Sequence, residues 1–285
     1  MKTSYASAPV SGSLRPAFSF DLLGPLVVRS YGMALDVGPP KRRVLLIRLL
    51  LEQGQAVPLD VLCEDLWTTR PPRGAVSSVH AHISRLRDVL EPERDRARRG
   101  HGGVLVRESL GYALRVPGET QDAVRFEQAL SRARRLLDQR RTGQARQELD
   151  AALALWRGTA LADAVNHPFA AHVSTRLEEA RLMAWELRVT ILVREGNLEE
   201  AVLAAEELIT RNPLREVTWE LLIQALYLSG RPAEALQRFA RLRGLLSEEL
   251  GMDPGRRLSR LQTAILRQDD TWLRNLGSRT PAHVD

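Results

Sequence analysis

Short apolar runs open the chain after a start without periodicity. Between Phe18 and Val37 the runs FSFDLL, LVVRSY and MALDV are separated by Gly24-Pro25 and by Gly32. Apolar runs of this length, bounded by glycine and proline, are typical of strands joined by turns. The pattern predicts a small antiparallel sheet, preceded by a disordered tail rich in Ser, Ala, Pro and Gly.

Three helical patterns and a hairpin follow. The first helix begins at Pro39 and ends before Gly54, the second begins at Pro58 and reads LDVLCEDLW, and the third covers residues 74–90. Proline is favoured in the first turn of a helix and glycine directly after the last. The runs VLVRES and YALRV, which meet near Gly111, predict the hairpin. A sheet, three helices and a final hairpin form the pattern of a winged helix-turn-helix domain.

The second half of the chain has helical periodicity and an internal repeat. Helical patterns run from residue 121 to about residue 268, interrupted by glycine and proline. Matching residues recur 34 positions apart in three pairs: Trp185 and Trp219, Gly196 and Gly230, Ala201 and Ala235. This is the period of the tetratricopeptide (TPR) repeat, a pair of antiparallel helices. We therefore expect an all-α, TPR-like half.

The expected fold class is mainly α with a small β-sheet and a wing. A chain of 285 residues exceeds what one simple core usually holds and is long enough for two domains. The expected segments are a disordered tail over 1–17, a winged-helix domain over 18–117, a linker over 118–121, a TPR-like domain over 122–270 and a second tail over 271–285.

All excess positive charge lies in the first domain. The net charge is +6, and residues 1–117 hold 17 of the 41 basic and 11 of the 35 acidic residues. A polyanionic partner for this segment is one interpretation, and ordinary charge for solubility is the other. The densest basic run precedes the hairpin and either follows a nucleic-acid backbone or forms a solvated loop: Arg94, Arg96, Arg98, Arg99 and His101.

The sequence disfavours several other classes of protein. No apolar run is long enough to span a membrane, and the N-terminus lacks the apolar core of a secretory signal. Cys63 is the only cysteine, which fits a reducing cytoplasm, and we expect it to be a small core residue rather than a reactive thiol. His80 and His82 point about 200° apart on a helix and cannot share a metal. We find no GxSxG, phosphate-binding loop, CxxC or convergent carboxylate pair, and we expect no enzyme activity, catalytic residue, cofactor or metal.

The helix over 74–90 has one apolar and one small, polar side. At about 100° per residue, Val79, Ile83, Leu86 and Leu90 fall on one stripe that is suited to a core. The side of the helix opposite this stripe suits the major groove of DNA. Its small residues allow close approach, a methyl group packs on thymine, and an arginine reaches guanine or phosphate. An ordinary solvated amphipathic helix is the alternative. The opposite side carries Ser77, Ala81, Ser84 and Asp88, flanked by Ser78 and Arg85.

Together these segments resemble a known family. FDLLGPLVV, PPKRRVLLIRLLL, LDVLCEDLW, SSVHAHISRLRDVL and GYALRV, in this order, are similar to the OmpR/PhoB-type winged helix-turn-helix of the AfsR/SARP family of actinobacterial regulators (Streptomyces antibiotic regulatory proteins). The segment NPLREVTWELLIQALYLSGRPAEALQRFARLRGLLSEELGMDPG resembles that family's all-α, TPR-like bacterial transcriptional activation domain. The resemblance covers about residues 18–268 and is most specific between Asn212 and Gly255.

The resemblance implies a sequence-specific transcription activator. Family members bind direct repeats in double-stranded DNA near the −35 region of promoters, side by side as dimers. They recruit RNA polymerase holoenzyme through its sigma factor and core subunits, and they activate antibiotic or other secondary-metabolite gene clusters. The implied location is the cytoplasm, on the nucleoid, without a membrane partner.

The resemblance also assigns roles to residues of this chain. The stretch HISRLR (82–87) matches the second half of the recognition helix, with arginines placed for bases and phosphates. Ser84 stands where relatives often carry Arg, and Tyr112 of the wing is placed for a phosphate. The loop TTRPPR (68–73) corresponds to a turn that touches sigma or the polymerase in relatives. The implied polymerase contacts are Thr68, Thr69 and Arg70, and the implied DNA contacts are Arg73, Ser77, Ser78, Ala81, His82, Ser84, Arg85, Arg87, Arg107, Ser109 and Tyr112.

A second function of a different class stays open. TPR-type grooves bind extended peptides, so the helical half alone would serve as a protein-binding scaffold to which DNA binding is incidental.

Overall fold

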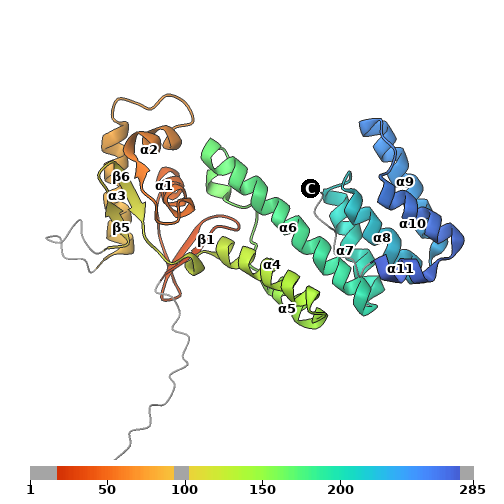
Figure 1. Cartoon of the computed structure of the whole chain (residues 1–285). Helices are drawn as coiled ribbons and strands as arrows, with labels where there is room; N and C mark the ends of the chain where they lie inside the picture. The colour runs from red at the N-terminus through yellow and green to blue at the C-terminus, as the bar shows by residue number, and fades with distance from the viewer. Residues whose placement is uncertain (1–17, 93–102, 277–285) are drawn as a thin grey trace, which may run out of the picture. The chain divides into compact units, whose positions relative to one another are not determined.

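The computed structural model describes residues 18–92 and 103–276, and its contacts divide the chain into two compact units. Of the described residues, the N-terminal unit comprises 18–92, 103–125 and 156–174, and the helical unit comprises 126–155 and 175–276. Figure 1 follows the elements in chain order. Outside the described residues lie the predicted tail over 1–17, the basic run at 94–101 and the last part, 277–285, of the predicted second tail.

The predicted small sheet is present at the start of the N-terminal unit. Strands β1 (Phe18–Asp21), β2 (Val27–Ser30) and β3 (Met33–Leu35) are antiparallel neighbours in that order. Phe20 pairs with Val28, and both side chains are fully buried. Alternate residues of a strand point to the same face, so one face of the sheet packs on the core and the other faces solvent.

The three predicted helices are also present. They are α1 (Pro40–Leu51), α2 (Leu59–Leu66) and α3 (Ala75–Leu90). Four successive residues of α1, from Val44 to Ile47, are buried, so α1 is packed on nearly all sides and forms the centre of this unit. The Cys63 side chain is 7% exposed, and burial raises the pKa of its thiol, as expected of a core residue.

The predicted hairpin consists of β5 (Leu105–Arg107) and β6 (Gly111–Leu114). A third strand that the sequence did not predict, β4 (Val57–Pro58), pairs with β6 and gives the order β4-β6-β5. A two-residue strand that ends in proline carries too little pattern to be recognised. A glycine is required at position 111 because a Cβ there would collide with the Val57 carbonyl oxygen.

Residues 156–174, here called the returning segment, complete the N-terminal unit, although the sequence placed them within the helical domain. The Arg157 amide donates to the Leu23 carbonyl (2.7 Å), and the Leu161 amide donates to the Leu22 carbonyl (2.8 Å). Leu161 is itself fully buried. The backbone groups of the β1–β2 loop therefore find partners more than 130 positions further along the chain.

Two carboxylates fix the same loop. Asp122 accepts hydrogen bonds from the amides of Leu22 (2.5 Å) and Leu23 (3.1 Å), and Asp163 of the returning segment accepts one from the Leu26 amide (2.6 Å). Burial raises the pKa of Asp122, and the two amide hydrogen bonds oppose that rise. The loop is thus held by side chains that lie outside the predicted winged-helix segment.

The far end of the returning segment contacts α1 and α2. Nδ1 of His167 lies 2.8 Å from the Asp65 carbonyl oxygen, and the guanidinium of Arg48 lies 5.5 Å from the centre of the Phe169 ring. Both α1 and α2 pack against α3. The scaffold beneath α3 therefore includes the returning segment.

The helical unit contains the predicted repeat. Its helix pairs α6/α7 and α8/α9 each turn at a glycine with positive φ, Gly196 (79°) and Gly230 (80°), which are 34 residues apart. Ala201 and Ala235, also 34 apart, are both fully buried where the paired helices approach. The helices after the hairpin are α4 (Asp122–Asp138), α5 (Thr142–Leu153), α6 (Pro168–Glu195), α7 (Leu198–Arg211), α8 (Glu216–Leu228), α9 (Pro232–Leu250), α10 (Arg256–Arg267) and α11 (Asp270–Leu276). The first residues of α4 and α6 belong to the N-terminal unit, as do single 3₁₀ turns at Gly118–Thr120 and Ala162–Ala164.

The first part of the predicted C-terminal tail is ordered. Residues 271–276 belong to α11, where the sequence predicted a tail from 271 onward. Leu273 is fully buried, its carbonyl accepts a hydrogen bond from Gln224 Nε2 (2.8 Å), and the Tyr227 hydroxyl donates to Asp270 (2.6 Å). A seven-residue helix has no stability of its own in water, so tertiary contacts decide that it forms.

Candidate nucleic-acid interface

Helix α3 presents a small-residue face to solvent. Val79, Ile83 and Leu86 are at most 1% exposed, which is the apolar stripe that the spacing predicts. Ser77, Ala81, Ser84 and Arg85 are exposed on the other side. The Arg85 side chain is 70% exposed and lies 3.9 Å from Asp88, a separation at which it stays free to reorient. Figure 1 shows α3 beside the β5–β6 hairpin, which is the wing.

The exposed arc of α3 is wider than the sequence suggested. Val76 is 46% exposed and His80 is exposed, and both lie on the arc that Ser77 and Ser84 occupy. At about 100° per residue they fall on the side of the arc nearer the wing. The sequence gave no signal for Val76, because it is apolar and lies only about 60° around the helix from Val79, and only its exposure in the structure marks it as outward.

One edge of α3 is fastened to the wing. Arg87 Nε donates to the Leu105 carbonyl (3.1 Å), and its guanidinium lies 5.6 Å from the centre of the Tyr112 ring. His80 meets the same ring edge-on at 6.1 Å, and Tyr112 is 5% exposed. These contacts show that Arg87 and Tyr112 join α3 to the wing, a role that the sequence did not indicate. Tyr112 is buried and Arg87 is half-buried, and their predicted contacts with DNA stay predictions.

The tip of the wing is open to solvent. Arg107 at the end of β5 and Ser109 in the turn are exposed, as their predicted roles require. Leu110, between them and β6, is 76% exposed. The sequence located this turn but gave no reason to single out an apolar residue at its tip.

The opposite edge of α3 lies near the start of α1. His82 is half-buried, and burial together with the positive charges of Arg42 and Lys41 lowers the pKa of its imidazole. Lys41 is exposed, and its ammonium lies 4.2 Å from the centre of the Trp67 ring. The sequence gave no signal for this cluster, because its members come from three separate helical segments.

The loop between α2 and α3 supplies the remaining predicted residues. Thr68, Thr69, Arg70 and Arg73 are all exposed. The first turn of α3 contains no acidic residue, and no side chain caps it, so the positive end of the helix is not neutralised locally. Ser78, in that first turn, is half-buried.

Within residues 18–92 and 103–276, no three His, Cys, Asp or Glu side chains gather as a metal site would require. No helix in these same ranges is long and apolar enough to cross a membrane.

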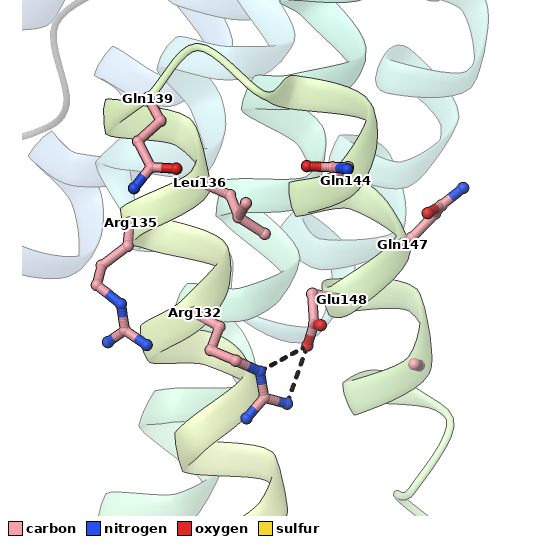
Figure 2. Close-up of a pocket in the computed structure, with 8 residues that line it drawn as sticks. Arg132, Arg135, Leu136, Gln139, Gln144, Gln147 and Glu148 are labelled. Atoms are coloured by element: carbon pink, nitrogen blue, oxygen red, sulfur yellow. Dashed lines mark hydrogen bonds and ion pairs between the residues drawn. The ribbon is translucent and has the colours of Figure 1, made fainter. Parts of the chain in front are cut away.

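The helical unit has a groove of its own, between α4 and α5 (Figure 2). Its volume is about 560 Å³. Arg132 donates to Glu148 (3.0 Å) across it, so helices α4 and α5 are bridged at this point. Polar side chains dominate its lining: Arg132, Arg135, Gln139, Gln144, Gln147 and Glu148.

Comparison with known proteins assigns each half of the chain to a known domain family. The model of the C-terminal domain of transcriptional regulatory proteins matches residues 37–114, and that of the bacterial transcriptional activator domain matches residues 121–266. The outward face of α3 on a winged helix, followed by the helical repeats, thus defines a winged-helix transcriptional regulator with an activator domain.

The chain belongs to the AfsR/SARP family of regulators. It is 40% identical over 260 residues to the regulatory protein AfsR of Streptomyces coelicolor, covering 91% of this chain and 25% of that protein. It is 33% identical over 263 residues to the regulatory protein DnrI of Streptomyces peucetius, covering 92% and 96%. The chain therefore spans about a quarter of the length of the AfsR relatives that it matches.

A solved structure shares the fold. Mycobacterium tuberculosis EmbR, in complex with a low-affinity phosphopeptide, aligns with a TM-score of 0.85 at 32% sequence identity. The alignment covers 93% of this chain and 69% of the EmbR chain.

Proposed function

We propose that this protein is a sequence-specific activator that reads double-stranded DNA with helix α3. The outward face of α3 carries the proposal: it has small residues at its centre, opposite a fully buried aliphatic stripe, and an arginine at its edge that is 70% exposed. A helix of about 10–12 Å diameter fits a major groove about 12 Å wide, and short outward side chains let its backbone approach the base edges closely.

The chemistry of each residue on this face suits one kind of contact. The Ala81 methyl packs against a thymine methyl, and Arg85 reaches the O6 and N7 atoms of guanine. Ser77 and Ser84 donate to base edges or to phosphate oxygens. Ser77, Ala81 and Ser84 are short and exposed, and Arg85 is long and exposed, so all four are accessible to a duplex.

Phosphate contacts would flank this reading face. Ser78 and Arg73 lie at the amino-terminal end of α3, where unneutralised backbone amides favour an anion. His82 borders the face at the α1 edge, and Arg107 and Ser109 lie on the exposed wing. Phosphate contacts fix the register of the protein on the duplex without selecting sequence.

The family supplies the wider expectation. Two copies would bind a direct repeat near the −35 region side by side and recruit RNA polymerase holoenzyme, with Thr68, Thr69 and Arg70 as the exposed contact to its sigma factor or core subunits. The target would be an antibiotic or other secondary-metabolite gene cluster, and the protein would act in the cytoplasm on the nucleoid. Relatives named as AfsR and DnrI support this assignment.

The test is fluorescence anisotropy with the full chain and DNA from promoters adjacent to its own gene. The full chain is needed because a fragment ending at residue 117 lacks the returning segment. Arg85→Ala should weaken specific binding by about 1–3 kcal/mol if Arg85 reads a base. Equal loss on random and specific DNA would make Arg85 a phosphate contact, and absence of specific binding by the wild type would refute the proposal. The matched control is Arg241→Ala, an exposed arginine of α9.

The groove between α4 and α5 favours a second candidate, a helical scaffold that binds an extended peptide. Carboxamides such as Gln144 and Gln147 can hydrogen-bond a peptide backbone, and Arg135 can bind an acidic side chain. The double variant Gln144→Ala/Gln147→Ala should then keep promoter binding and lose activation in transcription with purified holoenzyme. Gln237→Ala, an exposed glutamine of α9, is its control. Unchanged activation would remove this candidate.

A further inference from the structure

We propose that Lys41 and Arg42, at the start of α1, bind the phosphate backbone of DNA along the edge of α3 that faces away from the wing. The inference rests on the proposed DNA-binding function and adds a second group of phosphate contacts that the sequence did not indicate. The protein would then contact the sugar-phosphate backbones on both sides of the major groove, one through the wing and the other through α1.

The two histidines of α3 define its two edges. His80 packs on Tyr112 of the wing. Helix α1 also packs against α3, and His82 lies near enough to Lys41 and Arg42 for their charges to lower the pKa of its imidazole. Their positions differ by two residues, which is about 200° around the helix. The wing and the start of α1 therefore flank the reading face from opposite sides.

The dimensions of DNA require a phosphate row on each side. A helix of about 10–12 Å diameter nearly fills a major groove about 12 Å wide, so both of its edges lie against sugar-phosphate backbone. On the wing side, Arg107 and Ser109 are available. On the other side, the basic groups that the structure brings to the edge of α3 are Lys41 and Arg42.

The position of Lys41 is suited to an anion. Its ammonium lies over the Trp67 ring at 4.2 Å from the centroid, and this cation–π contact restrains an otherwise flexible side chain while leaving it exposed. In the described ranges, 18–92 and 103–276, no carboxylate forms an ion pair with Lys41 or Arg42. Asp36, the nearest acidic residue along the chain, accepts a hydrogen bond from the Gly38 amide.

The side chains, and not the helix end, must supply this affinity. Pro39 and Pro40 have no N–H groups, and the amides of Arg42 and Arg43 donate to the Pro39 carbonyl. Few backbone donors are therefore left at the start of α1 for a phosphate. Arg42 is partly committed, because its Nη1 donates to the Val37 carbonyl (3.2 Å), so Lys41 is the principal group.

The experiment is an anisotropy titration of the full chain, wild type and Lys41→Ala, on promoter DNA and on random DNA at several salt concentrations. A lost phosphate contact should weaken binding to both DNAs by the same factor, several-fold, and reduce the slope of log K against log salt by about 1. Lys41→Arg should retain the slope, and Arg241→Ala on α9 should leave both quantities unchanged. Thermal denaturation shows whether each variant is folded.

Three results would overturn the inference. The first is an unchanged affinity and salt slope in Lys41→Ala, and the second is a loss confined to promoter DNA, which would indicate base reading. If the wild-type chain bound no promoter DNA, the inference and the proposed function would fall together, whereas the first two results leave that function intact.

Discussion

Within the N-terminal unit, Asp163 joins the returning segment to α1 and to the β1–β2 loop, so replacing this residue tests whether the segment is part of that unit. Its carboxylate accepts hydrogen bonds from Arg43 Nε (2.6 Å), Arg43 Nη2 (3.0 Å) and the Leu26 amide (2.6 Å). The side chains of Arg43 and Asp163 are 24% and 20% exposed. Burial acts to raise the pKa of Asp163, but the hydrogen bonds from Arg43 and Leu26 hold it below its ordinary value.

The magnitude follows from what Asp163→Ala leaves behind. Hydrogen bonds to a charged group contribute about 1.5–3 kcal/mol each, and a donor left without a partner costs about 1–3 kcal/mol. Water reaches part of this site, so the three losses do not add fully, and we expect the unit to lose about 2–4 kcal/mol. Asp163→Asn keeps an acceptor for Leu26 and should lose less. A double-mutant cycle of Asp163→Ala and Arg43→Ala should give a coupling energy between the two side chains of about 1–3 kcal/mol.

The assay must report on the N-terminal unit alone, because a chain of two units need not unfold in one step. Hydrogen exchange of peptides covering residues 20–27 and 156–166, measured across a urea series at neutral pH, gives the opening free energy of this contact. Glu108→Ala is the control, since its pair with Arg115 is exposed and contributes at most about 1 kcal/mol. An Asp163→Ala effect no larger than that of the control would refute the reasoning.

The remaining predictions concern the helical unit and the pH dependence of stability. Arg215→Ala leaves Glu186, which is 7% exposed, without its ion pair, so the helical unit should lose about 3–5 kcal/mol of unfolding free energy in urea denaturation. The control Arg211→Ala breaks an exposed pair and should lose at most about 1 kcal/mol. Equal losses in the two variants would contradict the conclusion that the pair between Arg215 and Glu186 is a buried, stabilising one. Burial and the charges of Arg42 and Lys41 lower the pKa of His82, so below about pH 6.5 the unfolded chain binds a proton that the folded chain resists, and stability falls as the pH falls. His82→Gln should show a shallower decline between about pH 7 and 5.5, and an identical decline in both proteins would count against this placement.

The recognition surface illustrates what a pattern of residues can and cannot specify. The spacing of Val79, Ile83 and Leu86 assigned the buried side of α3 correctly, because a helix fixes the direction of each side chain from its position. The same spacing could not tell Arg85, which is exposed beside Asp88, from Arg87, which packs on the Tyr112 ring. That difference depends on the wing, which is some 20 residues away along the chain.

The sequence by itself determined most of the elements and their repeat, although it missed β4 and α11. Apolar periodicity, proline and glycine placed the helices, the first sheet and the hairpin, because these depend on neighbours within a few residues. The 34-residue spacing placed Gly196 and Gly230 at equivalent turns for the same reason.

Only the tertiary structure decided which distant segments share a core. Residues 156–174 have helical and turn signals like those around them, yet they bond to the loop at 22–26 and to α1. Lys41, Trp67 and His82 become neighbours only when α1, α2 and α3 pack together. Such contacts depend on the complementarity of surfaces far apart in the chain, which local periodicity does not encode.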